Sequence, residues 1–192
     1  MKKQDFKVLK TADLHPFPDN PFHVVEDEML SELAESIKEF GIVTPIITRP
    51  KEDGNGYEII AGQRRIRASE LAGINTIPAF VLPLGRDRAI ITLVDSNLQR
   101  ENILPSERAF AYKMKSEAMK RQGFRTDLTS SQVGTKLRTD DKVAQGFGVG
   151  RMTVQRFIRL TELIPPILQM VDEGKIALTP AVELSFLKKD EQ

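Results

Sequence analysis

Tyr57-Glu-Ile-Ile-Ala-Gly-Gln-Arg-Arg-Ile-Arg-Ala68 changes character at Gly62, where an apolar run rich in β-branched residues gives way to three arginines. The pattern predicts a strand that ends where a basic helix begins. Free N–H groups in the first turn of a helix carry partial positive charge, so amides, dipole and guanidinium together could hold a phosphate there. Gly62 would let that phosphate approach the main chain. The alternative is a strand-turn-helix unit with a solvated basic face.

A second polar cluster, Asp95-Ser-Asn-Leu-Gln-Arg-Glu-Asn102, follows the apolar run 89–94. Together the two clusters resemble the ParB/Noc family of bacterial DNA-partition proteins, which carries a Gly-Glu-Arg-Arg-x-Arg-Ala box and then a Glu-Asn-Leu-Gln-Arg box. Here the boxes read Gly62-Gln-Arg-Arg-Ile-Arg-Ala68 and Ser96-Asn-Leu-Gln-Arg100. The resemblance covers nearly all of residues 12–187, including Asn20-Pro21 and the turn Gly41-Ile-Val-Thr-Pro45.

Short strands and helices alternate in the first part of the chain. A helix is predicted over 28–40, with Leu30, Leu33, Ala34 and Ile37 inward and Gly41 closing it. Strands are predicted over 45–48 and 57–61, around a hairpin turn at Asp53-Gly-Asn-Gly56, and over 77–82. These elements indicate an α+β domain over residues 1–104, and its fold resembles sulfiredoxin as well as ParB. We interpret Met1 to Lys10 as a disordered terminus; an ATPase-activating segment is the alternative.

From Pro105 onward the strand signals stop, which predicts an all-α domain over residues 105–192. Ser106 is expected to be the N-cap of a helix that runs to about Gln122, with Glu107 in its first turn. Residues 123–139 are rich in Ser, Thr and Gly and are predicted to form a loop with a short helical turn.

A helix-turn-helix is predicted at about 140–160, because Ala144, Gly148 and Val154 have the spacing of two helices that cross at a short turn. A glycine at position 146 would weaken the first helix by on the order of 1 kcal/mol. The second helix, about 151–160, should bury Val154, Phe157 and Ile158. Its remaining side would meet DNA, through Gly150, Arg151, Met152, Thr153, Gln155, Arg156 and Arg159. A purely structural helical hairpin is the alternative.

Charge supports nucleic-acid binding by the same region. Residues 106–160 contain 12 Lys and Arg against 5 Asp and Glu, whereas the whole chain has a net charge of only +1. Such a basic block can replace the counterions condensed on phosphates.

We expect a cytoplasmic, nucleoid-associated protein without a membrane span, since no apolar run approaches about 20 residues and no secretory signal is visible. The chain has no cysteine, and neither His15 nor His23 has a partner at metal-ligand spacing.

The resemblance implies a DNA clamp controlled by a nucleotide. Members of the family bind an inverted-repeat centromere site through the helix-turn-helix, bind CTP with Mg²⁺ in the N-terminal domain, and close as dimers into a ring that slides on DNA. A ParA-type ATPase is the implied partner. The family usually adds a separate dimerisation domain after a linker, which leaves truncation of a longer chain open.

The matching positions define the expected nucleotide site. The resemblance places the phosphates at Gly62, Gln63, Arg64, Arg65, Asn97 and Arg100, with Asn97 also at the metal. More weakly, it places the nucleoside at Asn20, Pro21, Gly41, Val43, Thr44 and Pro45.

Two departures bear on hydrolysis, because Gln63 and Ser96 stand where the family has glutamates. Loss of a carboxylate removes a candidate base and a charged metal ligand. We therefore expect CTP to be bound but hydrolysed slowly or not at all, unless Asp95 or Glu101 substitutes for the missing carboxylates.

Two alternative functions stay open. The first is a nucleoid-occlusion or transcription-regulating DNA binder of the same family, and the second, less favoured, is a kinase or nuclease on the same scaffold. The chemistry of sulfiredoxin itself needs a cysteine, and this chain has none.

Overall fold

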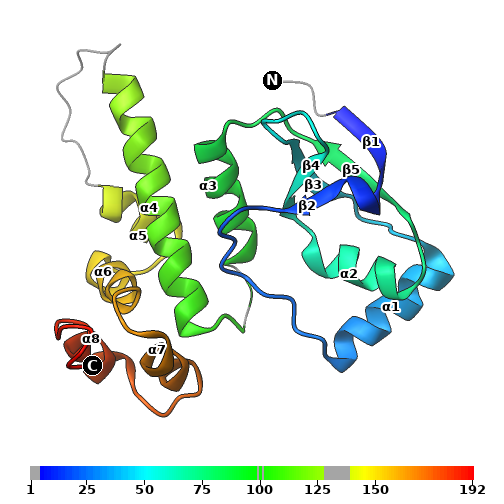
Figure 1. The fold of residues 1–192 in the computed structure, drawn as a ribbon. Helices are drawn as coiled ribbons and strands as arrows, with labels where there is room; N and C mark the ends of the chain where they lie inside the picture. The colour runs from blue at the N-terminus through cyan, green and yellow to red at the C-terminus, as the bar shows by residue number, and fades with distance from the viewer. Residues whose placement is uncertain (1–4, 99, 101, 128–138) are drawn as a thin grey trace. The chain divides into compact units, whose positions relative to one another are not determined.

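The computed structural model describes residues 5–98, 100, 102–127 and 139–192, and these fall into two compact units, one up to Leu93 and one from Val94 (Figure 1). The first unit contains a mixed β-sheet, with parallel and antiparallel strand pairs, together with helices. All the elements described beyond α3 (Arg86–Asn97), which runs from the first unit into the second, are helices. No helix in the described ranges is both long and apolar enough to cross a membrane.

The sheet has five strands in the order β1-β5-β3-β4-β2. Antiparallel pairs join β1 to β5 and β3 to β4, whereas β3 pairs with β5, and β2 with β4, in parallel. A short 3₁₀ turn, Thr11–Asp13, connects the first two strands. The strands span Asp5–Lys10 (β1), Leu14–Pro16 (β2), Ile46–Pro50 (β3), Tyr57–Ala61 (β4) and Thr76–Val81 (β5).

Helix α2 (Gln63–Leu71) packs on one face of this sheet, and α1 (Glu28–Phe40) packs on α2 (Figure 1). Ile66 of α2 joins a core formed by strand residues such as Ile46, Ile59 and Ile77. Ala68, on the other side of α2, packs with buried residues of α1. The basic helix is therefore held from both sides.

The strand and helix predictions for this unit are largely confirmed. The bounds of β4 and α1 are those predicted, and the hairpin of β3 and β4 forms around residues 53–56. Strand β3 continues to Pro50, and β5 begins at Thr76.

The prediction of a disordered start was wrong for Asp5–Lys10, which form β1; residues 1–4 lie outside the described ranges. Strand β1 pairs with β5 over its whole length, from Asp5 opposite Val81 to Lys10 opposite Thr76. Backbone hydrogen bonds at a sheet edge need little apolar patterning, and only Leu9 of this strand is buried.

Gly62 forms the junction between β4 and α2 and has a left-handed backbone, with φ of 108°. A Cβ at this position would lie 2.6 Å from Cγ2 of Ile46 in β3. Glycine is thus required by both backbone conformation and space, and the requirement comes from the sheet core.

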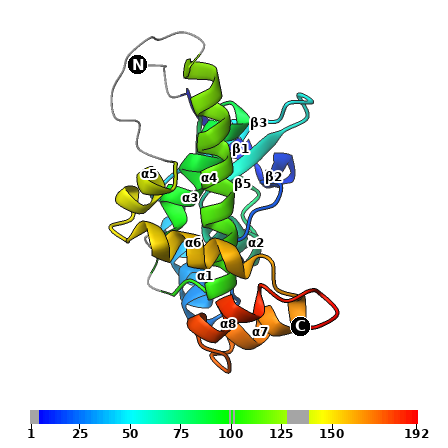
Figure 2. The same ribbon diagram turned by 90° about the vertical axis from the view of Figure 1, so that its left-hand side faces the viewer.

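The second unit is built along α4 (Pro105–Asp127), the long helix that α6 crosses (Figure 2). Buried residues of α4, α6, α7 and α8 form one core, and residues of α4, α5 and α6 form another. The first of these clusters includes Leu163, Ile164, Leu168, Val171, Ile176 and Leu178. The other helices are α3 (Arg86–Asn97), α5 (Thr139–Gly146), α6 (Arg151–Leu160), α7 (Pro165–Asp172) and α8 (Leu178–Leu184).

Three expectations for this unit need correction. Ser106 is not the N-cap of α4, because Pro105 already occupies the first helical position, which suits its missing N–H. The helix continues to Asp127, so 123–127 are helical rather than loop, and 128–138 lie outside the described residues. Gly146 is the last residue of α5 rather than an interior one, so its cost to the helix is small.

The Ser106 side chain instead links α4 to α7. Its backbone N–H donates to Asp172 Oδ1 at 2.8 Å, and its hydroxyl donates to Asp172 Oδ2 at 2.5 Å. The carboxylate thus satisfies a free N–H group in the first turn of α4, where negative charge is favourable.

An ion pair between Arg49 and Glu58 is buried inside the first unit. Arg49 Nε donates to Glu58 Oε2 at 2.6 Å, and the side chains are 2% and 8% exposed. Arg49 Nη1 also donates to the carbonyl of Leu84 at 3.3 Å, and its guanidinium lies 5.3 Å from the centre of the Phe17 ring. The pair therefore ties β3 and β4 to the segments before and after them.

Glu58→Gln should lower the free energy of unfolding by about 3–5 kcal/mol, because it removes the buried carboxylate and leaves the buried Arg49 cation with only the exposed Glu52 carboxylate at 3.4 Å. Urea unfolding followed by circular dichroism measures the change. Glu52→Gln is the matched control, because Glu52 pairs with the same arginine but is 72% exposed, and it should cost less than about 1 kcal/mol. Equal losses for the two variants would contradict a structural role for the buried pair.

Candidate functional site

The first turn of α2 presents backbone N–H groups that no side chain caps. Its N-cap is Gly62, the next three residues are Gln63, Arg64 and Arg65, and a third arginine follows at Arg67. Uncapped amides at the positive end of a helix form a ready site for an anion. The neighbouring guanidiniums could add positive charge for an anion at this turn. How much they add depends on which groups they already contact.

Two of the three arginines are engaged by carboxylates. Arg64 donates to both oxygens of Asp27, at 3.2 and 2.9 Å, and this bond lowers the pKa of Asp27 below its ordinary value. Asp27 also caps α1 by accepting from the Leu30 N–H at 2.9 Å. Arg67 pairs with Glu26 at 2.5 Å and with Glu70 at 3.1 Å. The ion pairs fix α2 against the start of α1.

Arg65 differs from its neighbours, because within the described residues it makes no ion pair. Its Nη1 donates to the carbonyl oxygens of Thr44 and Pro45, at 2.5 and 2.6 Å. The guanidinium is half-buried, and this desolvation lowers the pKa of Arg65 from its ordinary value. A partly desolvated cation without a carboxylate partner attracts an anion more strongly than a solvated one.

The structure thus joins two separate predictions, the arginine turn and the turn at 41–45. Gly41 closes α1 with φ of 73°, and its N–H donates to the carbonyl of Ile37 at 2.8 Å. Val43, next along the turn, is 84% exposed. The turn therefore places two carbonyls on Arg65 and leaves an apolar side chain open beside them.

A hollow of about 640 Å³ lies beside α2 in the first unit. It brings together Asn20, expected at the nucleoside, and Gln63, expected at the phosphates. The amide nitrogen and oxygen of Gln63 are buried without a hydrogen-bond partner among the described residues. Asn20 shapes the wall, since its Oδ1 accepts from the Phe22 N–H at 3.2 Å, and Pro21 between them is buried.

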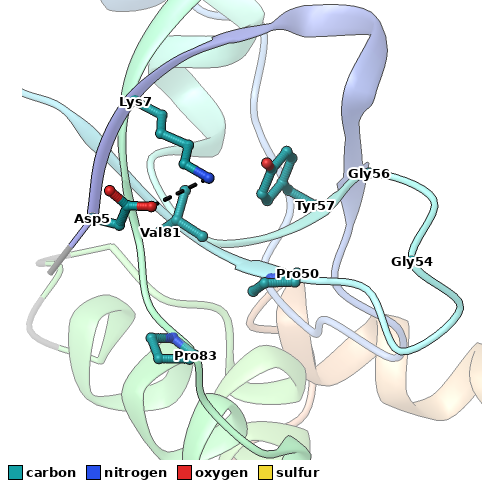
Figure 3. A pocket seen from close by; sticks show the side chains of 8 residues that line it. All are labelled: Asp5, Lys7, Pro50, Gly54, Gly56, Tyr57, Val81 and Pro83. Atoms are coloured by element: carbon teal, nitrogen blue, oxygen red, sulfur yellow. Dashed lines mark ion pairs between the residues drawn. The ribbon is translucent and has the colours of Figure 1, made fainter. Parts of the chain in front are cut away.

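A second hollow, of about 320 Å³, opens at the hairpin end of the sheet (Figure 3). Its wall includes Lys7 and Tyr57, but Lys7 Nζ lies 3.2 Å from Asp5 Oδ2. The hydrogen bond to Asp5 raises the pKa of Lys7. The cation is thus neutralised locally, and this hollow fits a phosphate poorly.

The second polar cluster of the sequence, which starts at Asp95, begins at the end of α3. Asn97 is 1% exposed and donates to Ser96 Oγ at 3.3 Å, while the Arg100 N–H donates to the Asn97 carbonyl at 3.1 Å. Asp95 Oδ1 accepts from Lys115 Nζ at 2.5 Å, which makes Asp95 a poor substitute base; Glu101 lies outside the described residues. The described residues contain no cluster of three or more His, Cys, Asp or Glu that could hold a metal.

Helices α5 and α6 meet at a tight turn in which Gly148 has φ of 64°. The Val149 N–H donates to the carbonyl of Ala144 at 3.1 Å, and Val154 is fully buried. Phe157 and Ile158 pack against the same cluster, as predicted. The bounds of α6 match the predicted second helix.

The residues expected to contact DNA have different surroundings. Gly150 is exposed and Met152 is 63% exposed, whereas Thr153 is half-buried. Four others have internal partners: Arg151 with Asp141, Gln155 with Asp140, Arg156 with Thr179, and Arg159 with Ser185.

Arg159 is the most firmly held of these. It donates to both the hydroxyl and the carbonyl of Ser185, at 3.0 and 2.6 Å, and lies 4.1 Å from the centre of the Phe186 ring. In this structure Arg159 therefore positions the end of α8.

Sequence reasoning missed the acidic partners Asp27 and Asp140 and the buried cation Lys115. Lys115 is 6% exposed, and its amino group lies 4.1 Å from the centre of the Phe147 ring. Asp27 carried a detectable signal, because an aspartate directly before an amphipathic helix is a common N-cap. The other two depend on contacts between distant segments.

Comparison with known proteins finds relatives over most of the chain. The ParB N-terminal domain family matches residues 1–98. The "Probable chromosome 1-partitioning protein ParB" of Deinococcus radiodurans is 39% identical over 161 residues, which are 84% of this chain and 49% of that protein. The nucleoid occlusion protein of Halalkalibacterium halodurans is 33% identical over 189 residues, which are 98% of this chain and 60% of that protein.

Among solved structures, the C-terminally truncated chromosome-partitioning protein ParB from Caulobacter crescentus, complexed to the centromeric parS site, matches with a TM-score of 0.58 and 26% identity. The match covers 95% of this chain and 86% of that chain. The chain thus spans about half to three-fifths of the length of the two curated relatives. On its sequence profile, fold and relatives, the chain belongs to the ParB N-terminal domain family.

Proposed function

We propose that the chain is a DNA-partition protein that binds an inverted-repeat centromere-like site and acts as a sliding clamp gated by CTP. The observation that carries the nucleotide half is Arg65, a half-buried cation without a carboxylate partner among the described residues, at the uncapped start of α2. The DNA half rests on α5 and α6, and on the parS complex of the related Caulobacter protein.

The proposed nucleotide site lies in a domain of residues 1–104. Gly62, Gln63 and Arg65 would hold the phosphates with the free amides of α2, and the turn 41–45 would bound the nucleoside. Arg64 would contribute the donors that Asp27 leaves free. From the family resemblance, Asn97 and Arg100 would complete the phosphate site, and Asn20 and Pro21 the nucleoside site.

The residues present could hold Mg²⁺ only together with the phosphates of a bound nucleotide. Mg²⁺ is typically held by one or two protein oxygens together with substrate phosphates and water. Asn97 offers an amide oxygen and no charge, and no acidic cluster exists among the described residues. When bound, the metal would neutralise phosphate charge, while the arginines and helix amides fix the position of the phosphates.

The proposed DNA reader is the α5–α6 pair within the domain 105–192. Gly150, Arg151, Met152 and Thr153 lie at the start of α6, the part of such a helix that reaches base edges. Gln155 and Arg156 follow, and Arg159 is assigned mainly to packing α8. Clamp action requires a second copy of the chain, and partition requires a ParA-type ATPase.

A nucleoid-occlusion protein is the second candidate, favoured by the Halalkalibacterium relative of that name. It would use the same two sites. A kinase or nuclease is less well supported, because Asp95 is held by Lys115.

Arg65→Ala should weaken CTP binding by about tenfold to a hundredfold, since hydrogen bonds to charged groups contribute about 1.5–3 kcal/mol. Binding of radiolabelled CTP, ATP and GTP measures this, and a preference for ATP would favour the kinase. Arg67→Ala is the control, because Arg67 is ion-paired and exposed. Equal losses in the two variants would contradict the assignment of Arg65.

Arg156→Ala should weaken binding to a duplex selected from a randomised inverted-repeat library by about tenfold, with nucleotide binding unchanged, because one phosphate or base contact is lost. Arg65→Ala should leave nucleotide-free DNA binding intact. Gel-shift and nucleotide-binding assays on both variants test the separation. The reverse pattern would overturn the assignment of the two sites.

CTP hydrolysis should stay close to background with and without DNA, because Gln63 and Ser96 replace carboxylates and Asp95 is bound to Lys115. Release of inorganic phosphate is the measurement. Gln63→Glu should raise it, as a carboxylate can activate water or bind the metal. Rapid CTP-dependent turnover by the unchanged chain would refute the expectation.

A further inference from the structure

Gln155 is an exposed residue of α6 whose amide is not free to turn. Its Nε2 donates to Asp140 Oδ2 at 3.2 Å. A carboxylate can only accept hydrogen bonds, so the nitrogen end of the amide must face Asp140. The oxygen end and the second N–H of Gln155 are left to point elsewhere.

Asp140 is itself fixed from the opposite side. Its Oδ1 accepts from the hydroxyl of Ser116 at 3.0 Å, and Ser116 lies in α4 and is 2% exposed. Asp140 stands in the first turn of α5, where the helix dipole favours a negative charge. A chain of hydrogen bonds therefore runs from the buried Ser116 of α4, through the Asp140 carboxylate, to the exposed Gln155 of α6.

This orientation has a consequence for base recognition. A glutamine reads adenine in the major groove with its amide oxygen and one N–H, and reversal of the amide would reverse donor and acceptor. We propose that Asp140, anchored by Ser116, is a positioning residue that sets the base preference of Gln155. The proposal rests on the function proposed above, in which α6 enters the major groove.

A purely structural role predicts something different. If Asp140 only joined α4, α5 and α6, its loss would weaken binding to every DNA sequence alike. If it orients Gln155, its loss relaxes the preference at one base pair in each half-site and leaves the other positions unchanged.

The test is selection of bound duplexes from a randomised inverted-repeat library by the full chain. Asp140→Asn keeps the shape but lets either end of the Gln155 amide face position 140. It should lower discrimination at one position of each half-site by about tenfold, as should Gln155→Ala, and the double variant should be no worse than Gln155→Ala alone. Ser116→Ala should have a smaller effect at the same position. Glu117→Gln, an exposed neighbour on α4, is the control and should change nothing.

Thermal unfolding of each variant shows whether it folds, and Ser116→Ala provides the test if Asp140→Asn does not. If the unchanged chain enriches a sequence, and the Asp140→Asn and Ser116→Ala variants keep the same base preferences, the inference is overturned. The proposed function then still stands. An unchanged chain that enriches no sequence would overturn the proposed function and the inference together.

Discussion

The close approach of Gly62 to Ile46 is the constraint on which the first unit depends. Because a Cβ would lie only 2.6 Å from Cγ2 of Ile46, a residue with a side chain does not fit where β4 leads into α2. Because Ile46 belongs to the sheet core, the core fixes the start of α2, and the ion pair of Arg64 with Asp27 adds to this. The same geometry brings Arg65 to the carbonyls of Thr44 and Pro45, so the proposed phosphate site follows from how the sheet packs.

Much of the fold could be predicted because its signals are local. The bounds of β4, α1 and α6 followed from hydrophobic period and flanking glycines. Strand β1 could not be found this way, since it is held by pairing with a segment about seventy residues away and buries only Leu9. The N-cap prediction for Ser106 was wrong because a serine before an acidic residue has the pattern of a cap. In the structure Pro105 begins the helix, and the Ser106 hydroxyl donates to Asp172.

The candidate site shows the same division between residue types and their partners. Sequence identified the arginines and the polar side of α6, but not the internal partner of each residue. The structure separates them: Arg64 and Arg159 are largely committed to internal partners, whereas the partners of Arg65 in the described ranges are carbonyl groups. These partners lie 20 to 37 residues away in sequence, and no local pattern specifies which arginine meets which group.

The bond between Ser106 and Asp172 joins residues 66 positions apart, at the start of α4 and the last residue of α7. Helical domains usually fold fast because their contacts are local, but this one must close a long loop before the bond can form. The closing entropy grows only slowly with loop length, so the bond can still add stability at equilibrium. Docking of α7 onto α4 should therefore come late on the folding pathway, after the α5–α6 hairpin has formed.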